Sequence, residues 1–231
     1  MSIKLNIKKA IVMAGIATMA VSGTIYAADN NEPATLDAEE VEYDMNTGLA
    51  SARGNVVMTK GNATVTGNYA EYNAKTKEGK VSGDVVATKE DMRVTADLVT
   101  TDGPDHMIAV GSVNGTKADN HFMGPRVEYF QEDEYLLIPS GGSITSPEGT
   151  FTADLIHGYL RDKHIVGNGN IHLVSPKNNM EVGGDQMDYW GEENGKAVIT
   201  GNAWAVQDNN TLKSKKLTVY LADDGKASVK Q

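Results

Sequence analysis

The sequence predicts an all-β protein: an elongated open β-jelly roll in which two curved antiparallel sheets face each other. Two observations predict this fold class. A two-strand pattern returns about seven times, once every ~29 residues, and turn-forming residues separate its strands about every 14 residues. Beyond the first 27 residues, no segment keeps the 3.6-residue apolar period of a helix. We therefore expect very little helix.

The first 27 residues have the order of a secretory signal peptide. Three lysines among the first nine residues give a basic start, and an apolar run covers residues 10–21. Small residues then lead to Ala27, where we expect cleavage. The apolar run is about 12 residues long, whereas roughly 20 are needed to span a bilayer. We therefore predict a signal peptide over residues 1–27 and an exported mature chain.

The repeat is defined by its first strand. Each first strand begins with an apolar residue, followed by a small residue two positions on, a second apolar residue five positions on, and often Tyr seven positions on. The seven starting residues are Leu36, Val65, Val94, Phe122, Phe151, Val182 and Leu212. Because the same order returns at nearly constant spacing, the chain is an internal repeat of two-strand elements.

The first strand is predicted to bend near its middle. Leu36 and Ala38 share one parity whereas Val41 and Tyr43 share the other, so the buried face changes near Glu39. A strand that changes its buried face bends or bulges and passes from one sheet to the other. A second series, glycine followed by a small polar residue, lies between the first strands at Gly54, Gly83, Gly111, Gly142, Gly169 and Gly201.

The domain organisation follows from the continuity of this period. No linker or change in composition interrupts the repeat, so we expect residues 28–231 to form a single domain. Tyr recurs at one repeat position, where we expect it to pack near strand edges rather than against a ligand: Tyr43, Tyr72, Tyr129 and Tyr189.

Composition excludes several functional classes. The chain has 21 Lys+Arg against 31 Asp+Glu, a formal net charge of -10, and no Cys. Without Cys neither a disulfide framework nor a thiolate metal site is possible. The acidic balance argues against nucleic acid as a partner, because phosphate contacts require a basic surface.

Residue types used in catalysis are present but are not arranged for it. The segment from Ser140 to Ser143 lacks the frame of a nucleophile elbow. Acidic pairs such as Glu39–Glu40 and Glu192–Glu193 fall near predicted bends or turns, where carboxylates are usually solvated. The five histidines lack the helical spacing of zinc enzymes: His106, His121, His157, His164 and His172. We predict no enzyme, no metal site and no cofactor.

The repeats resemble a known family. The leader, the segment Leu36–Asp44, and the motifs beginning at Gly54 and Gly83 are similar to the OstA/LptA family of periplasmic lipopolysaccharide-transport proteins. The resemblance covers residues 34–222. It implies an open, twisted β-jelly roll in the periplasm whose hydrophobic interior receives the acyl chains of lipid A. It also implies head-to-tail assembly, with itself and with related jelly-roll domains of the inner-membrane and outer-membrane transport components.

The physical case for a lipid groove is separate from the resemblance. Moving an acyl chain of about twelve carbons into water costs on the order of 9 kcal/mol, at ~0.8 kcal/mol per methylene. A stack of hairpins with one apolar face inward offers a continuous dry path. The candidate groove residues are Leu36, Val41, Val56, Met58, Val65, Val85, Val94, Leu98, Phe122, Val127, Phe151, Ile156, Ile171 and Leu173. Ten methionines against three phenylalanines favour a pliable interior.

Alternative interpretations remain at this point. The groove residues equally suit a closed sandwich core without ligand, as in a secreted structural or adhesive β-repeat protein. A polysaccharide-acting β-helix enzyme is disfavoured, because its rungs are usually about 20–25 residues long. Because the chain is acidic, lipid binding should tolerate salt, with local attraction to phosphates at most from Lys213, Lys215 and Lys216, which otherwise form a solvated strand face.

Overall fold

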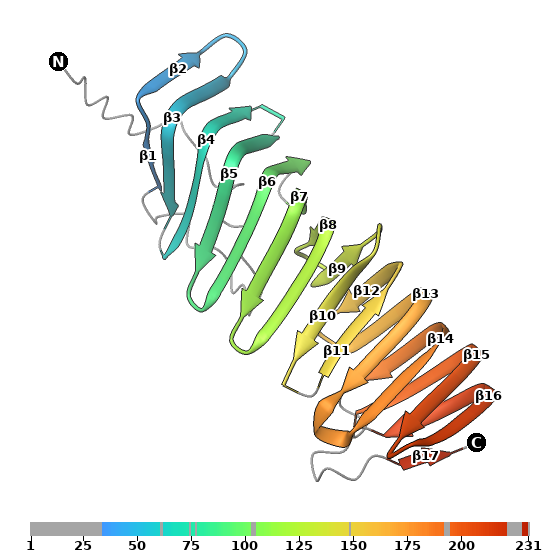
Figure 1. The fold of residues 1–231 in the computed structure, drawn as a ribbon. Coiled ribbons are helices and arrows are strands. Elements are labelled where there is room, and N and C mark those ends of the chain that lie inside the picture. The colour runs from blue at the N-terminus through green and yellow to red at the C-terminus, as the bar shows by residue number, and fades with distance from the viewer. Residues whose placement is uncertain are drawn as a thin grey trace. The chain divides into compact units, whose positions relative to one another are not determined.

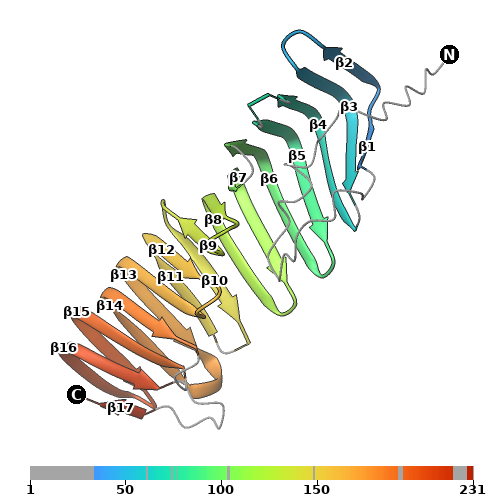
Figure 2. The same cartoon turned by 180° about the vertical axis from the view of Figure 1, so that it is seen from behind.

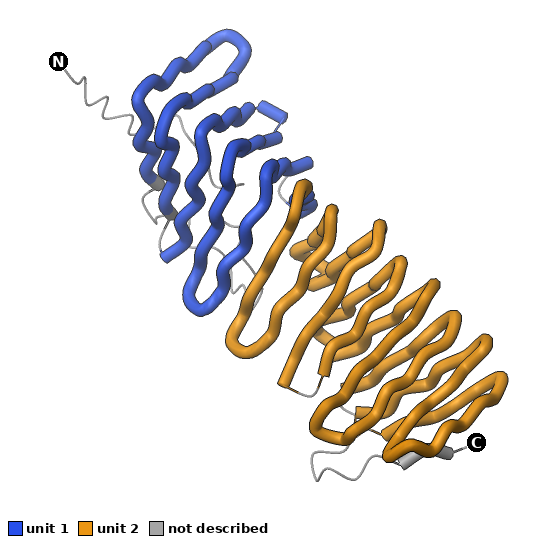
Figure 3. Tube along the Cα trace, in the orientation of Figure 1, with its two compact units in different colours: residues 1–109 blue, residues 110–231 orange. Residues whose placement is uncertain are grey.

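The computed structural model describes residues 34–60, 62–73, 75–76, 78–102, 105–147, 149–191, 195–220 and 228–230. The predicted signal peptide lies outside these residues. The described part of the chain forms seventeen β-strands and one short 3-10 helix, η1 (Pro176–Asn178), so the all-β prediction is confirmed (Figures 1 and 2). Among these residues, no helix has the length and hydropathy of a membrane span. The chain divides into two compact units, residues 1–109 and residues 110–231 (Figure 3).

Unit 1, residues 1–109, is an antiparallel meander. β3 pairs with β4, β4 with β5 and β5 with β6, and β1 and β2 both pair with β3. β7 (His106–Lys117) begins in this unit and contains the boundary. The strands before it are β1 (Ala34–Asp37), β2 (Glu40–Asp44), β3 (Leu49–Lys60), β4 (Ala63–Asn73), β5 (Gly79–Lys89) and β6 (Met92–Asp102).

Unit 2, residues 110–231, continues the same pattern. β8 pairs with β9 and β10, β13 pairs with β11 and β12, and antiparallel pairing then runs from β13 to β17. Its strands after β7 are β8 (Asn120–Phe130), β9 (Tyr135–Ile138), β10 (Gly142–Ser146), β11 (Gly149–Ala153), β12 (Leu155–Tyr159), β13 (His164–Ser175), β14 (Met180–Trp190), β15 (Lys196–Gln207), β16 (Asn210–Tyr220) and β17 (Ser228–Lys230).

A corner divides the strands of each repeat into two arms. β1 pairs with residues 57–60 of β3 and β2 with residues 49–53, so these two short strands are one strand interrupted at residues 38–39. The predicted change of face near Glu39 is therefore confirmed. In unit 2, β9 with β10 and β11 with β12 are interrupted in the same way. We call the half-strands that align with β1, or in unit 2 with β10 and β11, the first arm, and the others the second arm.

β4 shows how the sequence produces the corner without a break. Its buried positions alternate through Ala63, Val65 and Gly67, and then resume with the opposite parity at Ala70 and Tyr72. The exposed Asn68 lies at the change of parity. Alternating Val and Thr favour the extended backbone on either side. The inner face, which carries the buried side chains of both arms, thus continues around the corner.

The glycine series supplies the bulge on the partner strand. Gly54 (φ +75°) and Asn55 (φ +49°) both lie in the left-handed region, and the ladder register shifts there between Arg53 and Val56. Two bulge residues thus oppose Asn68 alone, which bends the strand. The left-handed pair recurs at Gly83–Asp84, Gly111–Ser112, Gly169–Asn170 and Gly201–Asn202.

At the fourth corner the left-handed glycine lies one residue before the member of the glycine series. Gly141, with φ +79°, is the left-handed glycine there, and not Gly142. Gly142 pairs with Ala153 in the β10–β11 ladder, which requires extended backbone, so the left-handed conformation falls one residue earlier.

Candidate functional site

In unit 1 the first arm gathers four predicted groove residues in one row across the sheet. Leu36 is in register with Met58, Met58 with Val65, Val65 with Ala87, and Ala87 with Val94. Met58 and Val65 are buried, whereas Leu36 and Val94 are partly exposed. The repeat spacing therefore predicted that residues about 29 apart in the sequence lie in one row, two strands apart.

The first arm of unit 2 carries the corresponding row. Phe122, Ile144, Phe151, Leu173, Val182, Ala205 and Leu212 follow one another in register over seven neighbouring half-strands. Phe122, Phe151 and Leu173 were predicted, and Ile171 lies two residues from Leu173 on the same buried face. This face is apolar throughout the row, as a lipid-facing surface requires.

Glycines leave room for the two phenylalanine rings of this row. A Cβ added to Gly115 or to Gly167 would collide with the ring of Phe122 or of Phe151, respectively. Both glycines are buried. The absent side chains thus allow each ring to lie directly over the neighbouring backbone.

The second arm of unit 2 holds a buried row of which only one residue was predicted. Its members in register are Ile138, Ile156, Gly167, Met187, Ile199 and Leu217, and every side chain in it is almost fully buried. Ile156 was predicted. Met187 and Leu217 occupy the fifth position after a repeat start, so the sequence pattern contained the signal for them. Ile138 and Ile199 lie on second strands, where the Gly-based pattern does not mark them.

The remaining predicted groove residues fall into three environments. Val56, Val85 and Val127 are buried beside the corners, as expected for inward positions. Val41 is 45% exposed because β2 is an edge strand whose recorded pairing is with β3. Leu98 differs from the prediction: it is in register with Ser82 on the outer face, while its neighbour Val99 is buried.

The inner row of unit 2 ends at a cavity. This cavity, of about 160 Å³, is lined by Ala205, Gln207, Asp208, Asn210 and Leu212. Ala205 and Leu212 form the last recorded pair of the row. The pocket is partly open to solvent and three of its five lining residues are polar, so its apolar lining is that of Ala205 and Leu212.

The outer face of unit 2 carries a row of neighbouring rings, tilted in its first two pairs and stacked in its last two. Phe130, Tyr135, Tyr159, His164 and Trp190 follow one another at ring-centroid distances of 5.5, 5.2, 5.4 and 5.0 Å. Lys196 Nζ lies 5.1 Å from the Trp190 centroid. His164 is nearly parallel to Trp190, at 7°, so the rings cover one another's faces and offer little stacking surface to a ligand. We interpret this row as cross-strand packing that stabilises the sheet.

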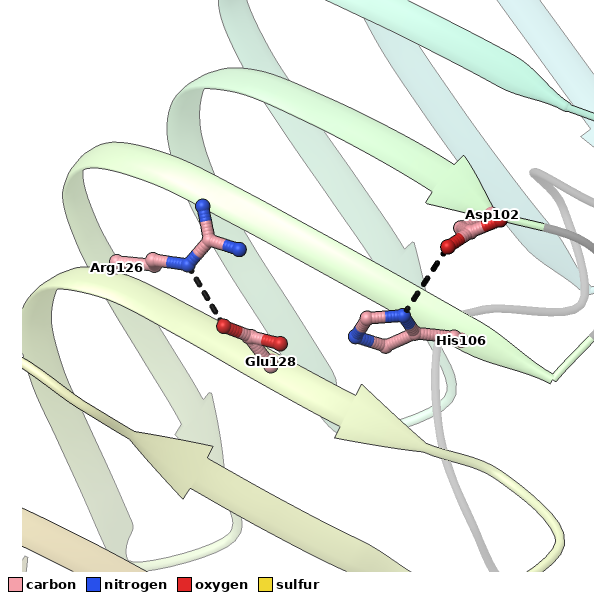
Figure 4. Close-up of polar contacts among 4 residues, drawn as sticks. All are labelled: Asp102, His106, Arg126 and Glu128. Carbon is pink, nitrogen blue, oxygen red and sulfur yellow. Dashed lines mark hydrogen bonds and ion pairs between the residues drawn. The ribbon is translucent and has the colours of Figure 1, made fainter.

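Titratable side chains are dispersed over the outer surface. Arg126 Nε donates a 2.7 Å hydrogen bond to Glu128 Oε1, and His106 Nδ1 lies 3.9 Å from Asp102 Oδ2; Figure 4 draws both contacts. His164 and His172 face single carboxylates, of Asp188 at 3.4 Å and Glu181 at 3.3 Å. Within the described ranges, no three His, Asp or Glu side chains form a metal-binding group.

The recurring tyrosines lie on the inner face of the second arm. Tyr72 and Tyr129 are buried, and burial raises the pKa of Tyr72. Tyr43 is in register with Ala50, and Ala50 with Tyr72, so they form part of the second-arm interior.

Comparison with known proteins finds a family match for the N-terminal part of the chain. Residues 35–135 match the family model described as LptA/(LptD N-terminal domain) LPS transport protein. No curated protein matches the chain. Among solved structures, LptH of Pseudomonas aeruginosa, described as the LptA homologous periplasmic component of the conserved lipopolysaccharide transport device, is 18% identical. That match covers 64% of this chain and 98% of LptH, with a TM-score of 0.34. The resemblance to the OstA/LptA family seen in the sequence is thus borne out over residues 35–135.

Proposed function

We propose that the protein binds lipopolysaccharide in the periplasm and shields the acyl chains of lipid A on its inner face. The observation that carries this proposal is the unbroken apolar row of the first arm in unit 2, from Phe122 to Leu212, which ends at a cavity. Each methylene that leaves water on such a surface gains ~0.8 kcal/mol. The family match over residues 35–135 supports the same ligand class.

The arrangement of hydrogen bonds allows the interior to open. In the described part of unit 2, the ladders run between neighbouring strands within each arm, so separating the two arms would break apolar packing but none of these ladder bonds. Acyl chains that enter between the arms would replace this packing with contacts of the same kind. The interior therefore acts as a core in the empty protein and as a groove when lipid is bound.

A bridging role follows from the edges of the sheets. Among the described residues, the ladders of β1 and β2 are with β3, and β17 pairs with β16 at Thr218–Tyr220. Unpaired strand edges accept a further strand by β-augmentation. We propose that these edges join copies of this protein, and related domains of the inner-membrane and outer-membrane components, head to tail.

One observation favours a second function. Ile138, Ile156 and Ile199 have no exposed surface, as in the dry core of a structural β-repeat protein without a lipid ligand. The two functions differ in whether lipid enters the interior, and the following experiment separates them.

The test is native mass spectrometry of the mature chain mixed with lipopolysaccharide, with salt raised in steps. We expect a lipid adduct that resists salt and is lost in Val56→Asp and Phe122→Asp. The matched controls are Val57→Asp and Met123→Asp, which place the same charge one residue away on the outer face. Circular dichroism verifies that all four variants stay β-rich. No adduct in the wild type would contradict lipid binding and favour the structural protein, and equal adducts in all variants would contradict binding on the inner face.

A further inference from the structure

The first and last repeats carry opposite charges at the same repeat positions. Residues 35–44 and 211–220 align without a gap, and both segments begin with Thr-Leu. In this alignment Asp37, Glu39 and Glu40 of the first repeat correspond to Lys213, Lys215 and Lys216 of the last. All six side chains are exposed. The charge reversal is therefore specific to three positions of the repeat.

Residues at the same repeat position lie at the same place on their strands and on the same face of the sheet. Leu36 and Leu212 both belong to inner rows of the first arm, so Asp37 and Lys213, one residue later, both lie on the outer face. Glu39 and Lys215 both lie at the corner, and Glu40 and Lys216 both begin the outer face of the second arm. Two such strands placed side by side in the same direction would bring each acid next to one lysine.

Lys215 occupies a corner position that carries a carboxylate in other repeats. At three corners a carboxylate on the first strand accepts a hydrogen bond from the Asn that follows the bulge glycine: Glu39 with Asn55 at 2.7 Å, Asp154 with Asn170 at 2.8 Å, and Asp185 with Asn202 at 2.9 Å. Lys215 occupies the corresponding position of β16, opposite the Gly201–Asn202 bulge. A lysine has no acceptor, so the group that complements it on an added strand is a carboxylate.

The edge that carries the lysines is open over this stretch. In the described part of the chain, β17 is the partner recorded on that side of β16, and it begins at Thr218. On that side, no described strand pairs with residues 210–217, which carry Lys213, Lys215 and Lys216. Among the described residues, β1 likewise pairs in register with β3.

We propose that the segment from Asp37 to Glu40 of a second copy of this chain adds to the open edge of β16, parallel and in register, with its three acids against the three lysines. The proposal rests on the proposed bridging function and names the residues that select the partner strand and its direction. Two first strands, or two last strands, would place like charges side by side, which disfavours the reverse assemblies. β17 limits the overlap, because the partner's strand meets it beyond Leu217.

A charge swap tests the proposal. One variant carries Lys213→Glu, Lys215→Glu and Lys216→Glu, and the other carries Asp37→Lys, Glu39→Lys and Glu40→Lys. By sedimentation velocity at low salt, we expect the wild type to associate, each variant alone to be monomeric, and an equimolar mixture of the two to associate again. Added salt should weaken the association, because exposed charge pairs are screened. The control variant, Lys89→Glu, Arg93→Glu and Lys177→Glu, carries the same charge change away from the two terminal segments and should associate like the wild type.

Three results would overturn the proposal: a wild type that stays monomeric, variants that associate like the wild type, or folded variants whose mixture stays monomeric. Circular dichroism checks folding in each case. Lipid binding is measured separately by the salt-resistant adduct in native mass spectrometry. Loss of that adduct with normal charge-dependent association would contradict the proposed lipid function and leave this assembly rule intact.

Discussion

Asn202 Nδ2 donates a 2.9 Å hydrogen bond to Asp185 Oδ2, across the corner where β14 and β15 change arms. The ladder between these strands shifts register at the same place, between Gly183 and Gln186. A side-chain bond therefore lies where the backbone ladder is interrupted. The equivalent bonds of Asp154 and Glu39 show that the acid–amide pair is a repeated device of the corners.

Breaking this pair should destabilise the protein by about 1 kcal/mol, the typical contribution of one hydrogen bond. Asn202 has φ +49°, so Asn202→Gly removes the amide without forcing an alanine into the left-handed region. A double-mutant cycle with Asp185→Ala, measured by urea unfolding, isolates the pairwise energy. Additive single and double variants would show that the bond contributes nothing to stability.

Alanine at the corner glycines should be tolerated unequally. Gly54 has φ +75°, and a Cβ there collides with the Glu39 carboxylate, whereas a Cβ on Gly141, at φ +79°, has no atom within 4 Å. Both substitutions cost about 1–2 kcal/mol of backbone strain. Gly54→Ala should lose additional stability because Glu39 must move and its bond to Asn55 breaks. Equal shifts in the urea midpoint would contradict this account.

Adjacent residues of β6 should respond oppositely to a charge. Val99 is 6% exposed on the inner face, so Val99→Asp should destabilise by about 3 kcal/mol or more. Leu98 lies on the outer face, and Leu98→Asp should change the free energy of unfolding by less than about 1 kcal/mol. Chemical unfolding of the two variants checks the parity of the strand. A larger loss for Leu98→Asp would mean that the face assignment is reversed.

Stability should fall at alkaline pH because of Tyr72. Burial raises the pKa of Tyr72 above its ordinary value of 10.0, so the folded state favours the neutral phenol. This contribution is fully present below pH 10.0 and is lost as pH rises through the higher folded-state pKa. Above pH 10.0, the free energy of unfolding should therefore fall less steeply with pH in Tyr72→Phe than in the wild type. Urea unfolding across the alkaline range makes the comparison, and identical pH profiles would exclude Tyr72 as the cause.

The sequence predicted the rows of the first arm well and the outer face poorly, for a physical reason. Leu36, Val65 and Val94 could be matched because equal spacing along a repeat becomes register across a sheet. Leu98 was misplaced because the change of parity falls at Asp97, and hydrophobicity alone does not show on which side of the corner a residue lies. The ring row from Phe130 to Trp190 was missed because it depends on the register of strands joined by turns of unequal length.

The distribution of indole rings supplies a built-in optical probe. Both tryptophans of the chain, Trp190 and Trp204, lie in unit 2, and each is in contact with a histidine ring. Intrinsic fluorescence therefore reports the unfolding of residues 110–231, whereas circular dichroism sums the strands of both units. The difference between the midpoints of the two transitions measures how strongly the folding of residues 1–109 is coupled to the folding of residues 110–231.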